Sequence, residues 1–289
     1  MRIVITGATG FVGGYLVPSL APDHDLFCLV RDPSRLPHDT NVIAVQGNLG
    51  VSDGLSELPD HADALLHFAQ ANIPFPDHAN ELFEVNAVST QRLADYARQA
   101  GASAFVYASS GNVYGQNAAP LVEDGPVQPQ GLYAMTKYVS EQVIACYTDF
   151  FNVCTLRLFA PYGPGQTGRM IPGIIGRVRA GQEVTVTNGG QPRINPVYID
   201  DVVRATRDAL LLTGHQVVNV AGPEVVSVED VARIAGQALG VQPRLQHSTD
   251  PTVWNLVADT TRFHNLFSLP DMVPPSEGIR RMVEAETGR

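Results

Sequence analysis

The sequence predicts an α/β fold: a doubly wound parallel sheet with helices on both faces, joined to a smaller C-terminal lobe. Two observations lead to this prediction. Short, almost continuously apolar runs alternate with longer amphipathic segments, and the chain becomes rich in Gly and Pro after residue 160. Such apolar runs are typical of strands buried on both faces. Strands that alternate with helices form parallel sheets through right-handed crossovers.

The elements of the sheet domain follow from these patterns. We expect buried strands at 2–6, 26–30, 42–46, 64–69, 104–109, 153–159 and 217–222. The segments that carry helical periodicity are 11–21, 81–101 and 133–151. We therefore assign one domain to residues 1–160 together with about 197–222.

The smaller lobe is expected to form from two pieces of chain, about 161–196 and 223–289. The first piece contains EVTVTNGG (183–190), which is typical of a strand and a turn. The second contains SVEDVARIAGQALG (227–240), a helical pattern with Ser227 as its N-cap. We expect the lobe to close over the sheet edge where the strand order reverses, because this architecture binds its ligands there.

Composition limits the class of protein. The 289 residues are 44% hydrophobic and 17% charged, with a mean hydropathy near zero, as in ordinary globular domains. A formal charge of −10 argues against nucleic-acid binding. The three cysteines cannot all pair and lack metal-ligand spacing, so we expect reduced thiols, no metal site and a cytoplasmic location. No apolar run approaches the roughly 18 residues of a membrane helix, so no membrane partner is expected.

A glycine-rich turn follows the first strand. Gly7, Gly10 and Gly13 are spaced G-x-x-G-x-x-G between a strand and a helix. Gly7 permits a tight turn, Gly10 lets the backbone approach a pyrophosphate, and Gly13 allows close helix packing, while N–H groups at the helix N-terminus face the phosphates. An ordinary glycine-rich turn is the alternative. The motif predicts that the first domain binds a dinucleotide and that the smaller lobe binds the substrate.

The end of the second strand, LVRDPSRL, bears on which dinucleotide binds. An acidic residue there holds the ribose 2′-OH of NAD, whereas an arginine accommodates the 2′-phosphate of NADP. If Val30 occupies the position of the acid, Arg31 is the next side chain and Arg35 is close by. This favours NADP(H). In the alternative, Asp32 takes the acidic role through a shift in register, and the cofactor is NAD(H).

Lys137 is the only lysine in the chain; all other residues in the Lys and Arg total of 19 are arginine. It lies four residues after Tyr133 in a helical segment, so both side chains share one face. A nearby ammonium stabilises the tyrosine phenolate and makes the phenol a usable acid at neutral pH. Lysine also offers a compact point charge to ribose hydroxyls, which the planar arginine group does not. Coincidence is the alternative.

Ser109 and Ser110 end an apolar strand 24 and 23 residues before Tyr133. Their hydroxyls are therefore expected at the carboxyl edge of the sheet, beside the cofactor, where one of them can bond a substrate carbonyl. On its own, a Ser-Ser pair at a strand end is usually a satisfied turn. Together with Tyr133 and Lys137, it becomes a candidate for the active site.

These motifs together resemble the extended short-chain dehydrogenase/reductase family of nucleotide-sugar epimerases, dehydratases and ketoreductases. The matching stretches are TGATGFVG, HFAQA, SSGNVYG, YAMTK, LRLFAPYGPGQ and PVYIDDVV, in family order from residue 6 to 203. The resemblance implies a Rossmann-type fold, with Ser110, Tyr133 and Lys137 as the catalytic trio. It also implies a homodimer formed through the segments near 82–100 and 133–149.

The resemblance and the glycine turn together define the expected cofactor contacts. They are Gly7, Gly10, Phe11, Val12, Gly13, Arg31, Arg35, Asn48, Leu49, Phe68, Ala69, Ala71, Asn86, Ser109, Tyr133, Lys137 and Phe159. The expected substrate contacts are Ser110, Asn112, Tyr133, Gln166, Arg169 and Arg193. For Arg193 the alternative is a structural bond to Asp200 or Asp201.

Departures from the family pattern narrow the chemistry. Dehydratases of the family carry an Asp-Glu pair directly after the catalytic Ser or Thr, whereas this chain has Gly111 and Asn112, which cannot serve as acid and base. Two family contacts to the substrate diphosphate are also replaced: an asparagine by Ala160, and an arginine within the segment 249–254.

The favoured function is NADPH-dependent reduction of a keto group on a nucleotide-activated sugar, or on an unactivated carbonyl metabolite, which the missing diphosphate contacts would explain. The first alternative is an NAD-dependent nucleotide-sugar 4-epimerase, which oxidises and re-reduces one carbon. A third hypothesis is a dinucleotide-sensing binding protein without catalysis, although such sensors typically lose the Tyr or the Lys.

Overall fold

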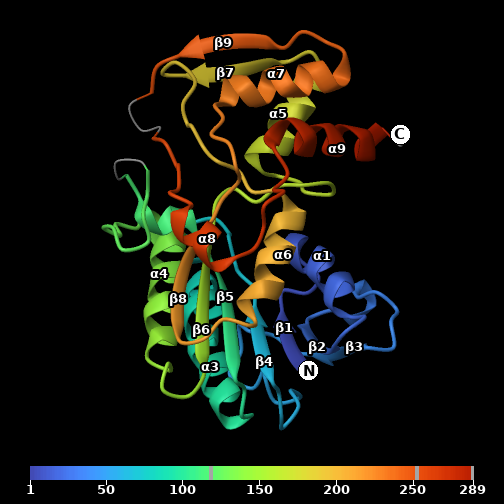
Figure 1. Cartoon of the computed structure of the whole chain (residues 1–289), viewed down its shortest axis with the longest axis vertical. Coiled ribbons are helices and arrows are strands. Elements are labelled where there is room, and N and C mark those ends of the chain that lie inside the picture. Colours follow the sequence, from blue (N-terminus) through green and yellow to red (C-terminus); the bar gives the residue numbers. More distant parts are fainter. Residues whose placement is uncertain (117–119, 251–253, 288–289) are drawn as a thin grey trace. The chain divides into compact units, whose positions relative to one another are not determined.

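The computed structural model describes residues 1–116, 120–250 and 254–287. Its described residues form two compact units, which we treat separately (Figure 1). The first unit comprises 1–115, 127–157 and 203–218, and the second comprises the rest of the described chain. The assignment of a cofactor to one domain and a substrate to the other stays a prediction.

A seven-stranded sheet dominates the first unit, in the order β3-β2-β1-β4-β5-β6-β8. Its strands are β1 (Arg2–Thr6), β2 (Asp25–Val30), β3 (Val42–Gln46), β4 (Ala64–His67), β5 (Ala104–Ser110), β6 (Asn152–Leu158) and β8 (His215–Val220). The pairings of β1 with β2 and β4, of β2 with β3 and of β4 with β5 are parallel. The strand order reverses between β1 and β4, so the predicted doubly wound α/β fold is confirmed.

Helices α3 (Ser89–Gln99) and α4 (Gly131–Ala145) pack against each other and onto the sheet. Their apolar side chains join strand residues in one core, which Phe105, Tyr107 and Phe151 fill. On α6 (Ile199–Ala209), Arg207 bonds Ser19 and Asp23 at the end of α1 (Phe11–Leu20). The predicted helix 133–151 ends earlier, at Ala145, because the chain turns there to place Phe151 in the core.

The predicted helix 81–101 is observed as three joined pieces. A short helix, α2 (Ala79–Phe83), leads into a π-helical turn (Glu84–Val88) and then into α3. Two side-chain hydroxyls form hydrogen bonds to backbone carbonyls of this turn: Ser89 Oγ donates to Val85 O, and Thr90 Oγ1 donates to Asn86 O. Single π turns inside α-helices are frequent at functional sites.

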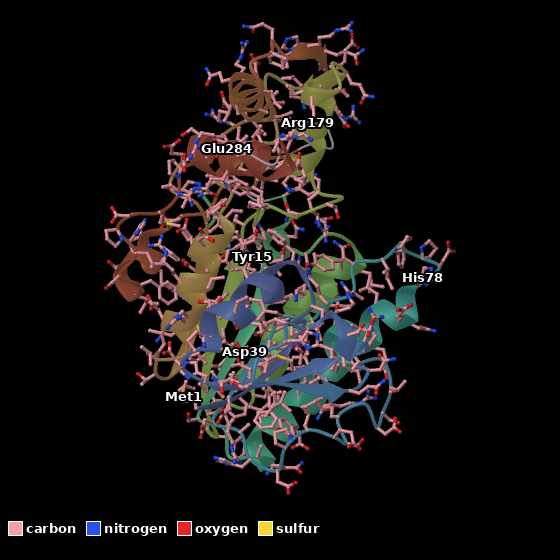
Figure 2. The ribbon with its side chains drawn as sticks, turned by 90° about the vertical axis from the view of Figure 1, so that its right-hand side faces the viewer. Met1, Tyr15, Asp39, His78, Arg179 and Glu284 are labelled. Atoms are coloured by element: carbon pink, nitrogen blue, oxygen red, sulfur yellow. The ribbon has the colours of Figure 1, made fainter. Side chains whose placement is uncertain are left out.

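In the second unit, β7 (Glu183–Thr187) pairs in parallel with β9 (Arg244–Ser248). The expected helix after Ser227 is α7 (Val228–Leu239), and its N-cap is confirmed: Ser227 Oγ accepts from Asp230 N, and the Asp230 carboxylate accepts from Ser227 N. The second unit also contains α5 (Met170–Arg179), α8 (Thr261–Leu266) and α9 (Pro275–Thr287). Helix α7 packs against both α5 and α9, and Arg179 at the end of α5 pairs with Glu286 of α9. Figure 2 labels Arg179 and, on α9, Glu284.

Helix α5 was not predicted, because MIPGIIGRVR contains one Pro and two Gly residues, which are poor helix formers. The pattern that could have predicted this helix is its helical spacing of apolar residues. These residues are all buried: Ile171, Ile174, Ile175 and Val178. Across the described part of the chain, no helix is both long and apolar enough to cross a membrane. The cytoplasmic location stays a prediction.

Candidate active site

The glycine turn lies between β1 and α1 and touches the segment after β4. Gly7 has a left-handed backbone (φ +77°), and a Cβ there would lie 2.5 Å from Ala69 N. A Cβ on Gly13 would lie 2.1 Å from Gly7 O. Both positions therefore require glycine, as predicted from the motif.

The N-terminus of α1 is suited to an anion. Gly10 is the N-cap and provides no side-chain acceptor, and the first turn of α1 contains no acidic residue. Arg35 Nη2 donates to Thr9 O at 3.3 Å, which places a cation beside the turn. The uncapped N–H groups, the positive helix end and this guanidinium together fit a dinucleotide pyrophosphate.

Beyond β2, Asp32 is engaged in its own turn. Its carboxylate accepts from Ser34 N at 3.1 Å and from Ser34 Oγ at 2.7 Å, and these bonds lower the pKa of the Asp32 carboxyl. The bonds cap the short 3₁₀ helix Pro33–Arg35. Arg31 is exposed. The preference for NADP(H) that we predicted from Arg31 and Arg35 stays a prediction.

Lys137 is buried in α4, with 1% of its surface exposed. Its Nζ donates to Ala108 O at 2.6 Å and lies 4.5 Å from the centroid of the Tyr107 ring. Burial lowers the pKa of the Lys137 ammonium to about 7, and the Glu141 carboxylate opposes this shift. The ammonium is therefore desolvated, with a backbone carbonyl and an aromatic ring as its neighbours.

Tyr133 and Ser110 border the same edge of the sheet. The Tyr133 hydroxyl donates to Gln70 Oε1 at 2.8 Å, in the segment that follows β4. Ser110 ends β5, and its Oγ accepts from Asn112 N at 3.2 Å. Because β1, β4 and β5 run parallel, the glycine turn, Gln70 and Ser110 all follow the carboxyl ends of neighbouring strands.

Several residues that were predicted to contact the cofactor form hydrogen bonds or close contacts within the protein. Asn86 Oδ1 accepts from Ala71 N at 2.7 Å, while Asn86 Nδ2 donates to Ala71 O at 2.9 Å. Asn48 Oδ1 accepts from Gly50 N. Phe68 adjoins the backbone of Gly7. The cofactor contacts of these residues stay predictions.

A buried ion pair behind the lysine was not anticipated from the sequence. Glu141 and Arg157 form it, with Nη2 of Arg157 2.7 Å from Oε2 of Glu141. Arg157 Nη1 donates to Tyr114 Oη at 2.8 Å, and the Ser109 hydroxyl donates to Glu141. The network joins α4 to β5 and β6. The sequence feature that could have indicated this ion pair is the position of Glu141, one helical turn beyond Lys137 on the same helix face as Tyr133.

The remaining predicted residues belong to the second unit. Gln166 Nε2 donates to Pro161 O at 2.7 Å, Arg169 is the N-cap residue of α5, and Phe159 is buried. Arg193 N donates to Asn255 Oδ1. The pKa of the Asp230 carboxyl is lowered mainly by its hydrogen bonds to Ser227 and, to a smaller extent, by the Arg193 charge. Their roles in binding stay predictions.

The alternative partners of Arg193 have contacts elsewhere in the second unit. Asp201 Oδ2 accepts from Val273 N at 2.9 Å, and Asp200 pairs with Arg281 at 3.4 Å. Ala160, where the family commonly has asparagine, has a left-handed backbone (φ 41°), which asparagine adopts more readily than alanine. Part of the segment 249–254, namely 251–253, lies outside the described residues.

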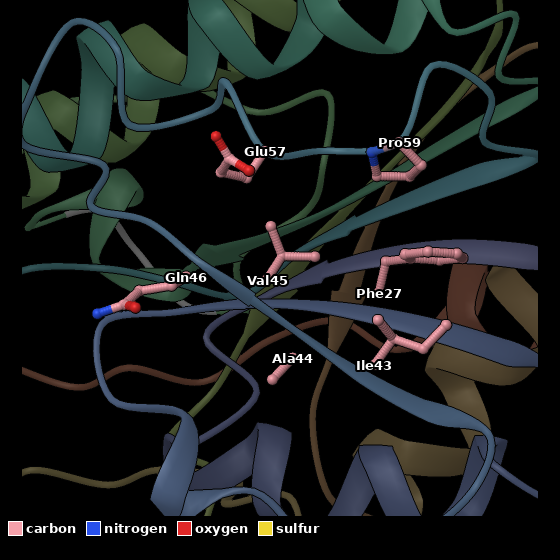
Figure 3. A pocket seen from close by; sticks show the side chains of 7 residues that line it. All are labelled: Phe27, Ile43, Ala44, Val45, Gln46, Glu57 and Pro59. Carbon is pink, nitrogen blue, oxygen red and sulfur yellow. The ribbon is translucent and has the colours of Figure 1, made fainter.

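A hollow of about 580 Å³ lies over β2 and β3 and is lined by Phe27, Ile43, Ala44, Val45, Gln46, Glu57 and Pro59 (Figure 3). None of these is a candidate site residue, so the hollow is not part of the proposed chemistry. Within 1–116, 120–250 and 254–287, no three His, Cys, Asp or Glu side chains group closely enough to hold a metal ion.

Comparison with known proteins shows similarity over most of the chain. Residues 3–221 match the model of the NAD-dependent epimerase/dehydratase family. The UDP-glucose 4-epimerase of Mycolicibacterium smegmatis is 29% identical over 98% of both chains. The GDP-6-deoxy-D-mannose reductase of Pseudomonas aeruginosa is 34% identical over 57% of this chain and 54% of its own. The structure of MoeE5 with UDP-glucuronic acid and NAD superposes with a TM-score of 0.88 and 25% identity, covering 100% and 99% of the two chains.

Proposed function

Since this chain belongs to the NAD-dependent epimerase/dehydratase family, we propose that it is an NAD-dependent nucleotide-sugar 4-epimerase. In this reaction C4 of the sugar is oxidised and then reduced from the opposite face, without net consumption of cofactor. The observation that carries the proposal is that Tyr133 and the buried Lys137 lie one turn apart on α4, that Lys137 Nζ bonds Ala108 O of β5, and that Ser110 ends the same strand. The similarity to an epimerase over 98% of both chains supports it.

Bound NAD would take up a hydride from the carbinol carbon and return it. The protein's part is proton transfer and orientation. Tyr133 as the phenolate takes the proton of the carbinol oxygen, and as the neutral phenol it gives the proton back. The Lys137 charge stabilises the phenolate with which the cycle begins and ends. Ser110 Oγ donates to the same oxygen and fixes its direction. Gly111 and Asn112 provide no acid–base pair, so elimination of water is not the proposed reaction.

The substrate contacts proposed for Gln166, Arg169, Arg193 and Asn112 serve the nucleotide and the sugar. Arginines suit a diphosphate because their planar groups donate two bonds at once. A homodimer through α3 and α4 is also proposed, supported by Met135 of α4, which is 44% exposed, and by Phe83 just before the π turn, which is 43% exposed. Light scattering on the purified protein tests it: a monomeric mass contradicts the dimer.

A specific observation favours a second candidate, an NADPH-dependent reductase. The Asp32 carboxylate is bonded by Ser34, while Arg31 is exposed and Arg35 approaches Thr9. This arrangement suits a 2′-phosphate better than a 2′-hydroxyl. The partial similarity to the Pseudomonas reductase agrees with it.

The test of the proposed reaction follows the sugar and the cofactor together. The protein is incubated with UDP-glucose or UDP-glucuronic acid and NAD, and the C4 configuration is followed by proton NMR. We expect the 4-epimer to accumulate with no net change in nicotinamide absorbance. Conversion that requires stoichiometric NADPH, with a keto sugar as the oxidised partner, contradicts the epimerase and supports the reductase.

Cofactor choice gives a separate prediction. Titration of cofactor-stripped protein, followed by nicotinamide fluorescence, should show NADH binding that Arg31→Ala changes by less than about twofold, since a 2′-hydroxyl gains little from a guanidinium. The exposed Arg98→Ala, in the same unit, is the matched control. Tighter binding of NADPH, lost in Arg31→Ala or Arg35→Ala but kept in Arg98→Ala, would move the reductase to first place.

A further inference from the structure

His67, the last residue of β4, is fully buried and has no part in the chemistry described above. It lies between Thr6 of β1 and Tyr107 of β5 in the sheet register. Its Nδ1 is 2.6 Å from Thr6 Oγ1, and its Nε2 is 2.9 Å from Thr90 Oγ1. Both hydroxyls are themselves fully buried. Both ring nitrogens therefore have a partner, and neither of these partners contacts water.

The neighbouring bonds determine where the ring proton lies. Thr90 Oγ1 donates its only hydrogen to Asn86 O at 2.5 Å, so it must accept from His67 Nε2–H. Nδ1 then carries no hydrogen and accepts from the Thr6 hydroxyl. Thr6 Oγ1 in turn accepts from Ala69 N at 3.2 Å. The opposite tautomer would leave the buried Thr6 hydroxyl hydrogen without an acceptor, which costs about 1–3 kcal/mol.

The surroundings of the ring keep it neutral. The ring packs 5.4 Å from Tyr107 and 6.4 Å from Phe105, measured between ring centroids. Burial, and then the Lys137 ammonium, lower the pKa of His67 to about 3. A second ring proton would also orphan the Thr6 hydroxyl. The neutral form with the proton on Nε2 is thus the state that satisfies every group around it.

These hydrogen bonds form a connected series that begins and ends in the segment 69–71. From Ala69 N they pass through Thr6, His67 and Thr90 to the carbonyl of Asn86. The Asn86 amide then holds both backbone groups of Ala71. Gln70, the acceptor of the Tyr133 hydroxyl, lies between the two anchored residues.

We propose that His67 is a positioning residue, which holds segment 69–71 against the glycine turn and sets the place of Gln70 opposite Tyr133. The close contact between the glycine turn and this segment supports the proposal, since a Cβ on Gly7 would lie 2.5 Å from Ala69 N. The proposal rests on the proposed function only for the identity of the cofactor.

Nitrogen NMR of protein labelled in its histidine rings tests the proton position without any activity. The chain has eight histidines, and the resonance of His67 is the one lost in His67→Gln. We expect a neutral ring protonated on Nε2 that stays unchanged from pH 5 to pH 9, where exposed histidines titrate. A ring protonated on Nδ1, or one that titrates near its ordinary pKa of about 6.5, overturns the proposal.

Variants test the positioning role. His67→Phe keeps the ring volume and removes both bonds, His67→Asn keeps an acceptor for Thr6, and His67→Gln keeps a donor for Thr90. We expect NADH affinity to fall about tenfold in His67→Phe, corresponding to about 1.4 kcal/mol, and to fall less in the two amide variants. Thr155→Val is the control: it also removes a fully buried hydroxyl, which has no hydrogen-bond partner among the described residues.

A role limited to stability would give a different pattern. It predicts a lower melting temperature in His67→Phe with the NADH affinity of the folded fraction unchanged, as it should be in Thr155→Val, and this result overturns the proposal. If His67→Phe does not fold, Thr90→Val is the second variant. It removes the Thr90 hydroxyl from the same series of hydrogen bonds while leaving His67 in place, and it must weaken NADH binding. If no sugar is converted at all, the proposed function fails, but the NMR and NADH results still decide the role of His67.

Discussion

Replacing Tyr133 by Phe is expected to lower turnover about 10²- to 10⁴-fold, the range associated with loss of a general acid–base group. The phenol is the group that moves the carbinol proton in the proposed mechanism, because a serine hydroxyl and an asparagine amide do not exchange protons readily at neutral pH and Gly111 has no side chain. Only the hydroxyl is removed, so the ring and the helix around it stay in place.

The measurement separates chemistry from binding. Steady-state rates give kcat and KM, and NADH titration gives cofactor affinity, which should change by less than about threefold because the lost group acts mainly in the transition state. Tyr138→Phe, on the same helix and also partly buried, is the control and should keep nearly full turnover. Full activity in Tyr133→Phe would rule out the proposed mechanism.

Replacing Lys137 by Met is expected to abolish most turnover and, at neutral pH, to stabilise the fold. The side chains have similar length, and Met suits a fully buried site. The folded protein lowers the pKa of this lysine from 10.5 to about 7 because it buries the ammonium. Since each pKa unit corresponds to about 1.4 kcal/mol, the charged lysine costs the fold a few kcal/mol.

The pH dependence has a definite sign. Because the folded pKa is lowered, the unfolded chain binds the proton more tightly, and the penalty is fully present below pH 7. It declines as the pH rises from about 7 to 10.5 and is absent above that range. The stability advantage of Lys137→Met in chemical denaturation should follow the same course. An advantage that is equal at pH 6 and pH 10 would contradict this account of the lysine.

Lys137→Arg separates the need for charge from the need for shape. Arginine keeps a cation, but its larger planar group must fit where Nζ now lies 4.5 Å from the centre of the Tyr107 ring. We expect this variant to be both inactive and less stable than the parent protein. Substantial activity in Lys137→Arg would show that the position requires only a positive charge.

Local sequence was sufficient for much of the fold and for the outline of the candidate site. The strand bounds were predicted to within two residues, because a strand buried on both faces must be apolar at every position. The expectation that 42–46 is buried was wrong: β3 is the edge strand of the sheet, and only Val45 in it is buried. Gly7 and Gly13 were assigned from spacing alone, and the structure shows why no other residue fits. The capping box at Ser227 was also readable, since it involves residues three apart.

Elements of the second unit were harder to predict. Helix α5 begins in a segment rich in Gly and Pro, and its four buried apolar residues become meaningful only when there is something for them to pack against. Strand β9 is largely exposed and depends on pairing with β7, which lies about 60 residues earlier in the chain. Exposed strands carry no continuous apolar signal, so their pairing decides whether they form.

The sequence by itself determined which groups share a helix face or a strand end: Tyr133 with Lys137, and Ser110 at the edge of the sheet. Only the tertiary structure decided how those groups are held. The burial of Lys137 beneath Ala108, the Glu141–Arg157 ion pair and the two bonds of His67 join residues 16 to 61 positions apart. Periodicity acts over a few residues, whereas desolvation and the hydrogen bonds of buried groups depend on which distant segments the packed core brings together.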